Sequence, residues 1–151
     1  MTRSLDATSN AALESLLEIR FVARADRLKL VRGSVRAAAR MCGFDDRSAQ
    51  NIVLAVDEAC QNIIVHAYKG HDDGEIVLSI FRRVDGIVLR VRDFAPLVDP
   101  SRIAPRALGD VRPGSLGTHF IREIMDAVEF LSVPDGRGNL LEMLKRTDEP
   151  T

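Results

Sequence analysis

The sequence of 151 residues lacks most of the features by which secreted and membrane proteins are recognised. Its two cysteines, Cys42 and Cys60, have no CxxC spacing and lie in apolar helical surroundings, which favours reduced core residues over a disulfide or metal pair. The longest purely apolar runs, such as 52–56, are far too short to cross a bilayer. The polar N-terminus has no hydrophobic signal region. We therefore expect a cytoplasmic protein.

An excess of charge of one sign is also missing. The chain has 21 Lys and Arg residues against 22 Asp and Glu residues, and its formal charge of −1 gives no global attraction to nucleic acid or to an anionic membrane. Neither an HExxH motif nor a P-loop ending in GKS or GKT occurs. The composition, with 46% apolar and 28% charged residues, is typical of one globular domain with a real core.

Apolar periodicity and turn signals predict elements in the order β-α-α-β-β-loop-α-β-β. We expect Asp26 to cap the first helix and Gly43 to close it, and Asp45 or Asp46 to cap the second helix. The expected elements are a strand at 16–26, a helix at 27–41, a second helix ending near Tyr68, a hairpin within 75–93 that turns at Asp85-Gly86, a helix at 116–128, and strands at 128–133 and 139–146.

This order mixes strands and helices without strict βαβ alternation, which predicts the α+β class. We expect a two-layer α/β sandwich, in which a mixed, mostly antiparallel sheet has its helices on one face. Residues 16–146 would form this single domain, between a flexible N-terminus at 1–15 and a C-terminal tail at 147–151.

A polar stripe interrupts the second helix, because Glu58, Asn62 and His66 lie four residues apart within an apolar stretch. The amide oxygen of Asn62 is a hard ligand suited to Mg²⁺, and Glu58, one turn away, could accept a proton from an attacking hydroxyl. His66 fits a pocket wall or a satisfied core histidine better than a zinc ligand. The alternative is a widened polar face of an ordinary amphipathic helix.

Asp93 ends a predicted strand and enters a loop that is rich in proline. A carboxylate at this position could accept a hydrogen bond from an exocyclic amine such as that of adenine, or it could be a turn or capping residue. The loop, about 20 residues long, is typical of a functional lid, and its arginines could supply charge for phosphate. A disordered surface loop with solvated arginines is the alternative.

Gly114 and Gly117 flank Ser115 and Leu116 just before the third helix. Glycines allow backbone N–H groups to approach phosphates closely, and a helix N-terminus favours anions. A plain transition from loop to helix explains the same pattern.

Together and in this order, the motifs resemble the GHKL ATPase superfamily with its Bergerat ATP-binding fold. More narrowly, the chain is similar to the bacterial anti-sigma-factor serine kinases of the RsbW and SpoIIAB kind. The similarity covers residues 16–146. Its motifs are LAVDEACQNIIVHAY for the N-box, RDFAPLVDP for the adenine-binding box, GSLGTHFIREIMDAVEF for the glycine box with its helix, and GNLLEMLKR for the closing strand.

The resemblance implies a role for each motif residue. Glu58 takes the position of the general base, Asn62 that of the Mg²⁺ ligand, and Asp93 that of the adenine-binding carboxylate. Ala95 stands where the family usually has a glycine, and Ser115 where many members have a second glycine. The ATP site, beneath a lid at 96–113, would comprise Asn62, His66, Asp93, Ala95, Arg112, Gly114, Ser115, Leu116, Gly117 and Thr118.

The resemblance further implies an ATP- and Mg²⁺-dependent serine/threonine kinase that acts as an anti-sigma factor. Its substrate would be an anti-anti-sigma protein of the STAS type, with a sigma factor as the competing partner. A homodimer is expected, without direct contact to nucleic acid or membrane. One rival is a nucleotide-binding module that sequesters partners without kinase activity. Another is the catalytic part of a sensor histidine kinase, but residues 1–15 are too short for a phosphoacceptor helix.

Overall fold

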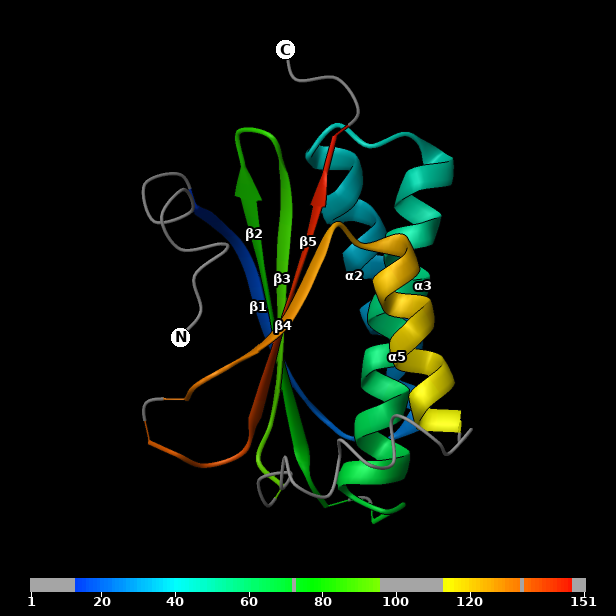
Figure 1. Ribbon diagram of the computed structural model, residues 1–151, viewed down its shortest axis with the longest axis vertical. Helices are drawn as coiled ribbons and strands as arrows, with labels where there is room; N and C mark the ends of the chain where they lie inside the picture. The colour runs from blue at the N-terminus through cyan, green and yellow to red at the C-terminus, as the bar shows by residue number, and fades with distance from the viewer. Residues whose placement is uncertain (1–12, 72, 96–112, 134, 148–151) are drawn as a thin grey trace.

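The computed structural model describes residues 13–71, 73–95, 113–133 and 135–147, with the backbone alone for 113–118. A sheet forms one layer, and the helices pack on one of its faces to form the second layer (Figure 1). This arrangement confirms the predicted α+β sandwich and the predicted order of elements. None of the described helices is long and apolar enough to cross a membrane.

The sheet contains five strands in the order β1-β2-β3-β5-β4, and every neighbouring pair among the described strands is antiparallel. The C-terminal strand β5 is therefore inserted between β3 and β4. The strands are β1 (Glu14–Val22), β2 (Glu75–Arg83), β3 (Gly86–Asp93), β4 (Ala127–Leu131) and β5 (Asn139–Arg146). The helices are α2 (Leu28–Met41), α3 (Asp46–Asn62) and α5 (Pro113–Ile124), with a 3₁₀ turn η1 (Ala25–Arg27) and a π-helix η2 (Ile63–Ala67).

The core lies between the sheet and the helices, because the apolar residues of both layers recur with the period of their element. Alternate residues of β2 and β3 face the helices and are fully buried, whereas every third or fourth residue of α2 and α3 meets them from the other side. Burying one such Leu, Ile or Val side chain stabilises a fold by about 1.5–3 kcal/mol. The largest contributors include Ile76, Leu78, Ile80, Ile87, Leu89, Val31, Val35 and Ile52.

The helix starts show one correct prediction and one wrong one. Asp45 caps α3, since its side chain accepts a hydrogen bond from the backbone N–H of Ser48 at 2.8 Å. Asp26 does not cap α2, which begins only at Leu28 after the 3₁₀ turn. The Asp26 carboxylate instead pairs with the neighbouring guanidinium groups of Arg24 and Arg27, so side-chain charge competes successfully with the cap.

Several element boundaries differ from the predicted ones because strand pairing decides them. β1 ends at Val22, where it pairs with Glu75, the first residue of β2. α5 ends at Ile124 rather than 128, because β4 begins at Ala127 and pairs with β5. The second helix is helical beyond Asn62 as predicted, but it changes there from an α-helix to a π-helix. Gly43 closes α2 with a φ of 97°, a left-handed conformation that suits glycine.

Candidate functional site

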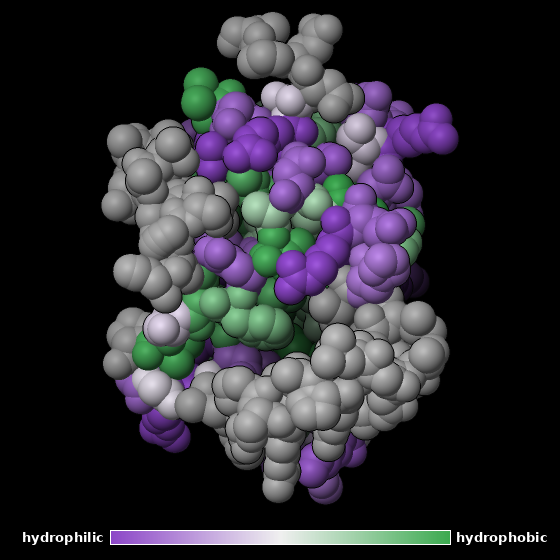
Figure 2. All heavy atoms as spheres, viewed as in Figure 1, coloured by the Kyte–Doolittle hydropathy of each residue, from purple (hydrophilic) through white to green (hydrophobic). Residues whose placement is uncertain are grey.

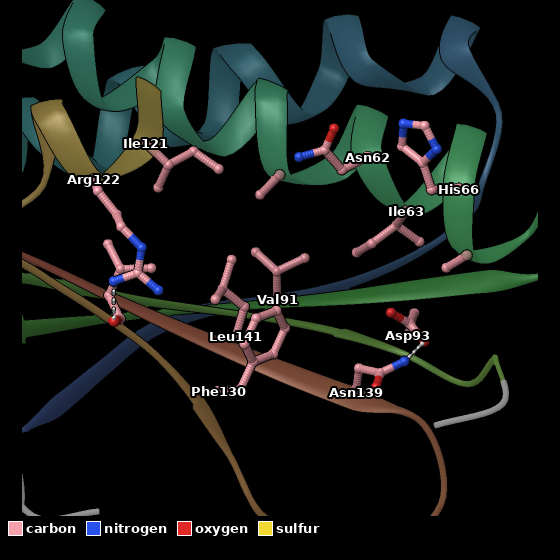
Figure 3. Close-up of a pocket in the computed structure, with 13 residues that line it drawn as sticks. Asn62, Ile63, His66, Val91, Asp93, Ile121, Arg122, Phe130, Asn139 and Leu141 are labelled. Carbon is pink, nitrogen blue, oxygen red and sulfur yellow. Dashed lines mark hydrogen bonds between the residues drawn. The ribbon is translucent and has the colours of Figure 1, made fainter. Parts of the chain in front are cut away.

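A cavity of about 280 Å³ lies between the helix layer and strands β3, β4 and β5. Apolar side chains are visible in a hollow near the middle of this face of the molecule (Figure 2). Most of the cavity wall is apolar, and its polar groups are few and lie on opposite sides. The lining residues are Ala59, Asn62, Ile63, His66, Ala67, Val91, Asp93, Ile121, Arg122, Val128, Phe130, Asn139 and Leu141 (Figure 3).

Asp93 is the buried carboxylate of this cavity. It is the last residue of β3 and only 3% exposed. Its Oδ1 atom accepts a hydrogen bond from the backbone N–H of Ala95 at 2.9 Å and another from the side-chain amide of Asn139 at 3.0 Å. Burial raises the pKa of Asp93, and the hydrogen bonds from Asn139 and Ala95 oppose that rise. A carboxylate held in this way inside an apolar cavity is a strong acceptor for an N–H donor of a ligand.

Asn139 is a site residue that sequence reasoning missed. It is the first residue of β5 and lies directly opposite Asp93 in the antiparallel pair with β3. Gly138 precedes it with a φ of 85°, and a Cβ at this position would lie 1.9 Å from the carbonyl oxygen of Asp93. Only glycine therefore permits this close approach. Asn139 belongs to the GNLLEMLKR motif, but the motif does not reveal its contact with Asp93, which depends on β5 pairing with β3.

The opposite wall of the cavity is formed by the end of α3 and by η2. Asn62 is the last residue of α3 and His66 lies in the π-helix, and both line the cavity from the helix layer, on the other side from Asp93 and Asn139; the His66 ring points away from the strands (Figure 3). Neither side chain has a hydrogen bond to another described residue. Single π-helical turns are frequently found at functional sites, and this one shifts His66 relative to a straight α-helical stripe.

Glu58 lies one α-helical turn before Asn62 but is not among the residues that line the cavity. Its side chain is half-buried and, like that of Asn62, has no hydrogen bond or ion pair within the described part of the chain. The structure thus brings Asn62, His66 and Asp93 together around one cavity, with Glu58 adjacent to it on α3.

The family resemblance raised a question about Ala95, because it implied a glycine at this position. Ala95 is buried at 4% exposure and does not adopt a positive φ, so its methyl group causes no backbone strain. Its N–H is one of the donors to the Asp93 carboxylate. The glycine-to-alanine difference is therefore compatible with the site.

Of the remaining predicted site residues, the structure describes the backbone of 114–118 and does not describe Arg112. Residues 114–118 lie in the first turns of α5, which begins at Pro113, a residue often found at the first position of a helix. The helix therefore begins three residues earlier than predicted and contains Gly114 and Ser115, whereas the sequence analysis began it at Leu116. Arg112 and the predicted lid at 96–113 lie outside the described residues, apart from Pro113.

The far end of the cavity contains residues that the sequence analysis did not assign to the site. Arg122 on α5 lines the cavity and donates a hydrogen bond from Nη1 to the carbonyl oxygen of Val128 at 3.1 Å. Phe130 on β4 lines it too, although its side chain is 61% exposed. Alternation within a predicted strand shows which residues share a face, but it does not show which face adjoins a cavity.

The wall also constrains which ligands fit. Among the described residues, no group of three or more His, Cys, Asp or Glu side chains could hold a metal ion. The donor set, one buried carboxylate on an apolar wall and an amide across from it, suits a flat ligand that carries an amine.

The fold and this cavity define a nucleotide-binding domain of known type. A model of the histidine kinase-like ATPase domain matches residues 21–145, and the chain belongs to this family. This match confirms the family resemblance seen in the sequence.

Within the family, the relatives that the chain matches include serine-protein kinases named RsbW. The RsbW of Listeria monocytogenes serotype 4a is 30% identical over 127 residues, which are 79% of this chain and 81% of that protein. The RsbW of Listeria innocua serovar 6a is 29% identical over the same shares of both chains. The RsbW of Bacillus pumilus is 27% identical over 124 residues, 76% of each chain.

Proposed function

We propose that the protein is an ATP-dependent serine/threonine kinase that acts as an anti-sigma factor and phosphorylates an anti-anti-sigma protein of the STAS type. The observation that carries this proposal is the buried Asp93 carboxylate, held by Asn139 and Ala95 at one side of an apolar cavity in a histidine kinase-like ATPase domain. The relatives named serine-protein kinase RsbW support the choice of a kinase. A cytoplasmic homodimer that binds a sigma factor as the competing partner completes the proposal.

In this proposal the strand wall binds the base of ATP. Asp93 accepts a hydrogen bond from the exocyclic amine of adenine, and the donors on Oδ1 keep the carboxylate oriented for it. Val91 and Leu141 from the sheet and Ile63 from the helix layer provide apolar surface for the ring. Burial of the adenine ring against these apolar side chains then supplies most of the binding affinity, and Asp93 provides the selectivity for adenine over other bases.

In the same proposal, residues of the helix layer bind Mg²⁺ and the phosphates of ATP. Asn62 would hold Mg²⁺ through its amide oxygen, and the backbone N–H groups at the start of α5 would bind phosphate oxygens. When bound, Mg²⁺ neutralises charge on the phosphates during phosphoryl transfer. Glu58 would accept the proton of the serine hydroxyl of the partner, for which its carboxylate has no competing partner among the described residues.

A transfer assay tests the proposal directly. The purified protein is incubated with Mg²⁺, ATP labelled on the γ-phosphate, and the STAS proteins encoded beside its gene. The expected result is label on a serine or threonine of one STAS protein, identified by mass spectrometry, and no label on a variant in which that residue is alanine. Absence of transfer to every such protein would contradict the kinase assignment.

A competition experiment tests the base contact separately. ATP and ADP should bind far more tightly than GTP, because the Asp93 carboxylate accepts from the amine of adenine but repels the carbonyl oxygen of guanine. Equal affinities for ATP and GTP would remove Asp93 from the base-binding role.

A second candidate is a nucleotide-binding regulator that sequesters its partners without phosphorylating them. The position of Glu58 outside the cavity lining favours this reading. The two candidates differ in the transfer assay: the regulator forms a nucleotide-dependent complex with its partner, which size-exclusion chromatography detects, but it transfers no label.

A further inference from the structure

Tyr68, the single tyrosine of the chain, ends the π-helix and uses both hydrogen-bonding functions of its hydroxyl group. The hydroxyl donates to the carbonyl oxygen of Glu75 at 2.8 Å and accepts the backbone N–H of Phe94 at 2.8 Å. Its ring occupies space that is open only because residue 74 is glycine: a Cβ on Gly74 would lie 2.4 Å from the ring. The Tyr68 side chain is therefore fixed both by packing against Gly74 and by its hydrogen bonds.

The two bonds of Tyr68 connect opposite walls of the cavity. Its backbone continues the helix that contains Asn62 and His66, and its N–H donates to Ile63 at 2.9 Å. Its hydroxyl reaches the first residue of β2 and the residue directly after Asp93. The end of the helix lies beside the start of β2 and the end of β3 at the lower edge of the molecule (Figure 1).

Three consecutive residues at this point are thus held in different ways. Asp93 is fixed by strand pairing with Ile76 on one side and Asn139 on the other. Phe94 is held by Tyr68, and Ala95 by the Asp93 carboxylate. Of these contacts, the bond from Phe94 to Tyr68 is the one that reaches the helix layer. Burial raises the pKa of the Tyr68 hydroxyl, so it stays protonated and able to donate at neutral pH.

We propose that the Tyr68 hydroxyl is a positioning group of the nucleotide site, which fixes the spacing between the helix wall and Asp93 and thereby determines the selectivity for adenine. This inference rests on the proposed function. Without the hydroxyl, Phe94, directly after Asp93, loses its hydrogen bond to the helix layer. The carboxylate then no longer meets the amine of adenine at the right distance, whereas ligands that do not use Asp93 are unaffected.

The test compares Tyr68→Phe with a matched control, Ile87→Val. The phenylalanine keeps the ring beside Gly74 and removes only the hydroxyl. The control removes one methyl group from a fully buried residue at the opposite end of β3, which lowers stability without touching the cavity. For wild type and both variants, calorimetry gives the affinities for Mg-ATP and Mg-GTP, and hydrogen exchange followed by NMR gives the protection of the Phe94 amide.

In Tyr68→Phe we expect the affinity for ATP to fall by roughly 3- to 10-fold, the range for loss of one net hydrogen bond, while that for GTP stays unchanged. The ratio of the two affinities falls by the same factor, and the Phe94 amide exchanges faster even without nucleotide. Ile87→Val should match wild type in the ratio of its ATP and GTP affinities and in the exchange rate of the Phe94 amide.

The possible failures are distinguishable. If wild type prefers ATP and Tyr68→Phe has the same ATP-to-GTP ratio as Ile87→Val, the inference is overturned and the proposed function stands. If wild type binds no ATP, the proposed function is wrong and the inference falls with it.

Discussion

The polar groups on the strand wall of the cavity are held by the protein itself, whereas those on the helix wall are not. Asp93 accepts hydrogen bonds from Asn139 and Ala95, and the next residue, Phe94, donates its backbone N–H to Tyr68 in the helix layer. Asn62 on the helix wall, and Glu58 beside the cavity on α3, have no such bond to any described residue. The strand wall is therefore organised before a ligand arrives, which is what the proposed recognition of the base requires. Asn62 and Glu58 keep their oxygen atoms available for the cation and the substrate hydroxyl that we propose they contact.

The largest expected effect on phosphoryl transfer comes from replacing Glu58, which lies on α3 beside the helix wall. Glu58→Gln preserves the size of the side chain and removes its basicity, so phosphoryl transfer to the partner should fall by about 10²–10⁴-fold. A loose transition state for phosphoryl transfer favours the lower end of that range. The affinity for Mg-ATP should not change, because the cavity lining excludes Glu58. Single-turnover transfer and calorimetric binding check the two halves; full activity in the variant would make Glu58 a structural residue.

Removing the negative charge of Asp93 on the strand wall should weaken ATP binding and stabilise the folded protein. In Asp93→Asn the amide cannot accept from adenine on the side of its NH₂ group, so the affinity for ATP should fall by about 1.5–3 kcal/mol, roughly 10- to 150-fold. Titration calorimetry with ATP measures this loss. An affinity equal to that of wild type would show that the carboxylate does not contact the ligand.

The same variant predicts a pH dependence with a definite sign. Burial raises the pKa of folded Asp93 above the value of 3.8 expected for an unfolded chain, so the ionised carboxylate destabilises the fold at neutral pH. Without nucleotide, Asp93→Asn should therefore unfold at a higher denaturant concentration than wild type at pH 7. The difference should shrink as the pH falls through the raised pKa, because the wild-type carboxyl is then neutral too. A difference independent of pH would refute this explanation.

Asn62→Ala tests whether the helix wall, unlike the strand wall, contributes to binding without contributing to stability. Because Asn62 has no hydrogen bond to the described protein, its loss should leave the melting temperature of the free protein almost unchanged. The Mg²⁺-dependent part of ATP binding should fall by at least about 1.4 kcal/mol, a tenfold change in affinity. Thermal shifts with ATP in the presence of Mg²⁺ or of a chelator separate the two contributions. An unchanged shift with Mg-ATP would exclude Asn62 from the site.

The smallest effect is expected at the other end of α3. Asp45→Ala removes the side-chain cap on Ser48 and should lower the melting temperature slightly, without altering nucleotide affinity. The hydrogen bond from the Ser48 N–H lowers the pKa of Asp45, so its contribution is present above 3.8 and is lost as the pH falls below it. Thermal melts at pH 7 and pH 3 should differ more for wild type than for the variant.

The sequence predicted most of the fold because its signals are local. The turn at Asp85-Gly86 determined the hairpin, and β5 occupies residues 139–146 as predicted. The cap at Asp26 failed because nearby arginines compete for its carboxylate, and strand ends failed because pairing with a distant strand decides them.

The same distinction explains which parts of the site could be predicted. Asn62 and Asp93 belong to motifs that are legible in a few consecutive residues, and both line the cavity. Asn139 and Tyr68 act through partners 46 and 26 residues away in the chain, respectively. Such contacts become visible only when the strand order is known.

The insertion of β5 between β3 and β4 has a consequence for how the protein is made. Synthesis delivers this strand last, so a growing chain has β3 with an unpaired edge and Asp93 without Asn139 beside it. If Asp93 binds the base as proposed, nucleotide cannot stabilise the domain at that stage, since the wall that contains Asp93 is incomplete. A prematurely terminated product would therefore combine an aggregation-prone edge with no capacity to be rescued by ATP.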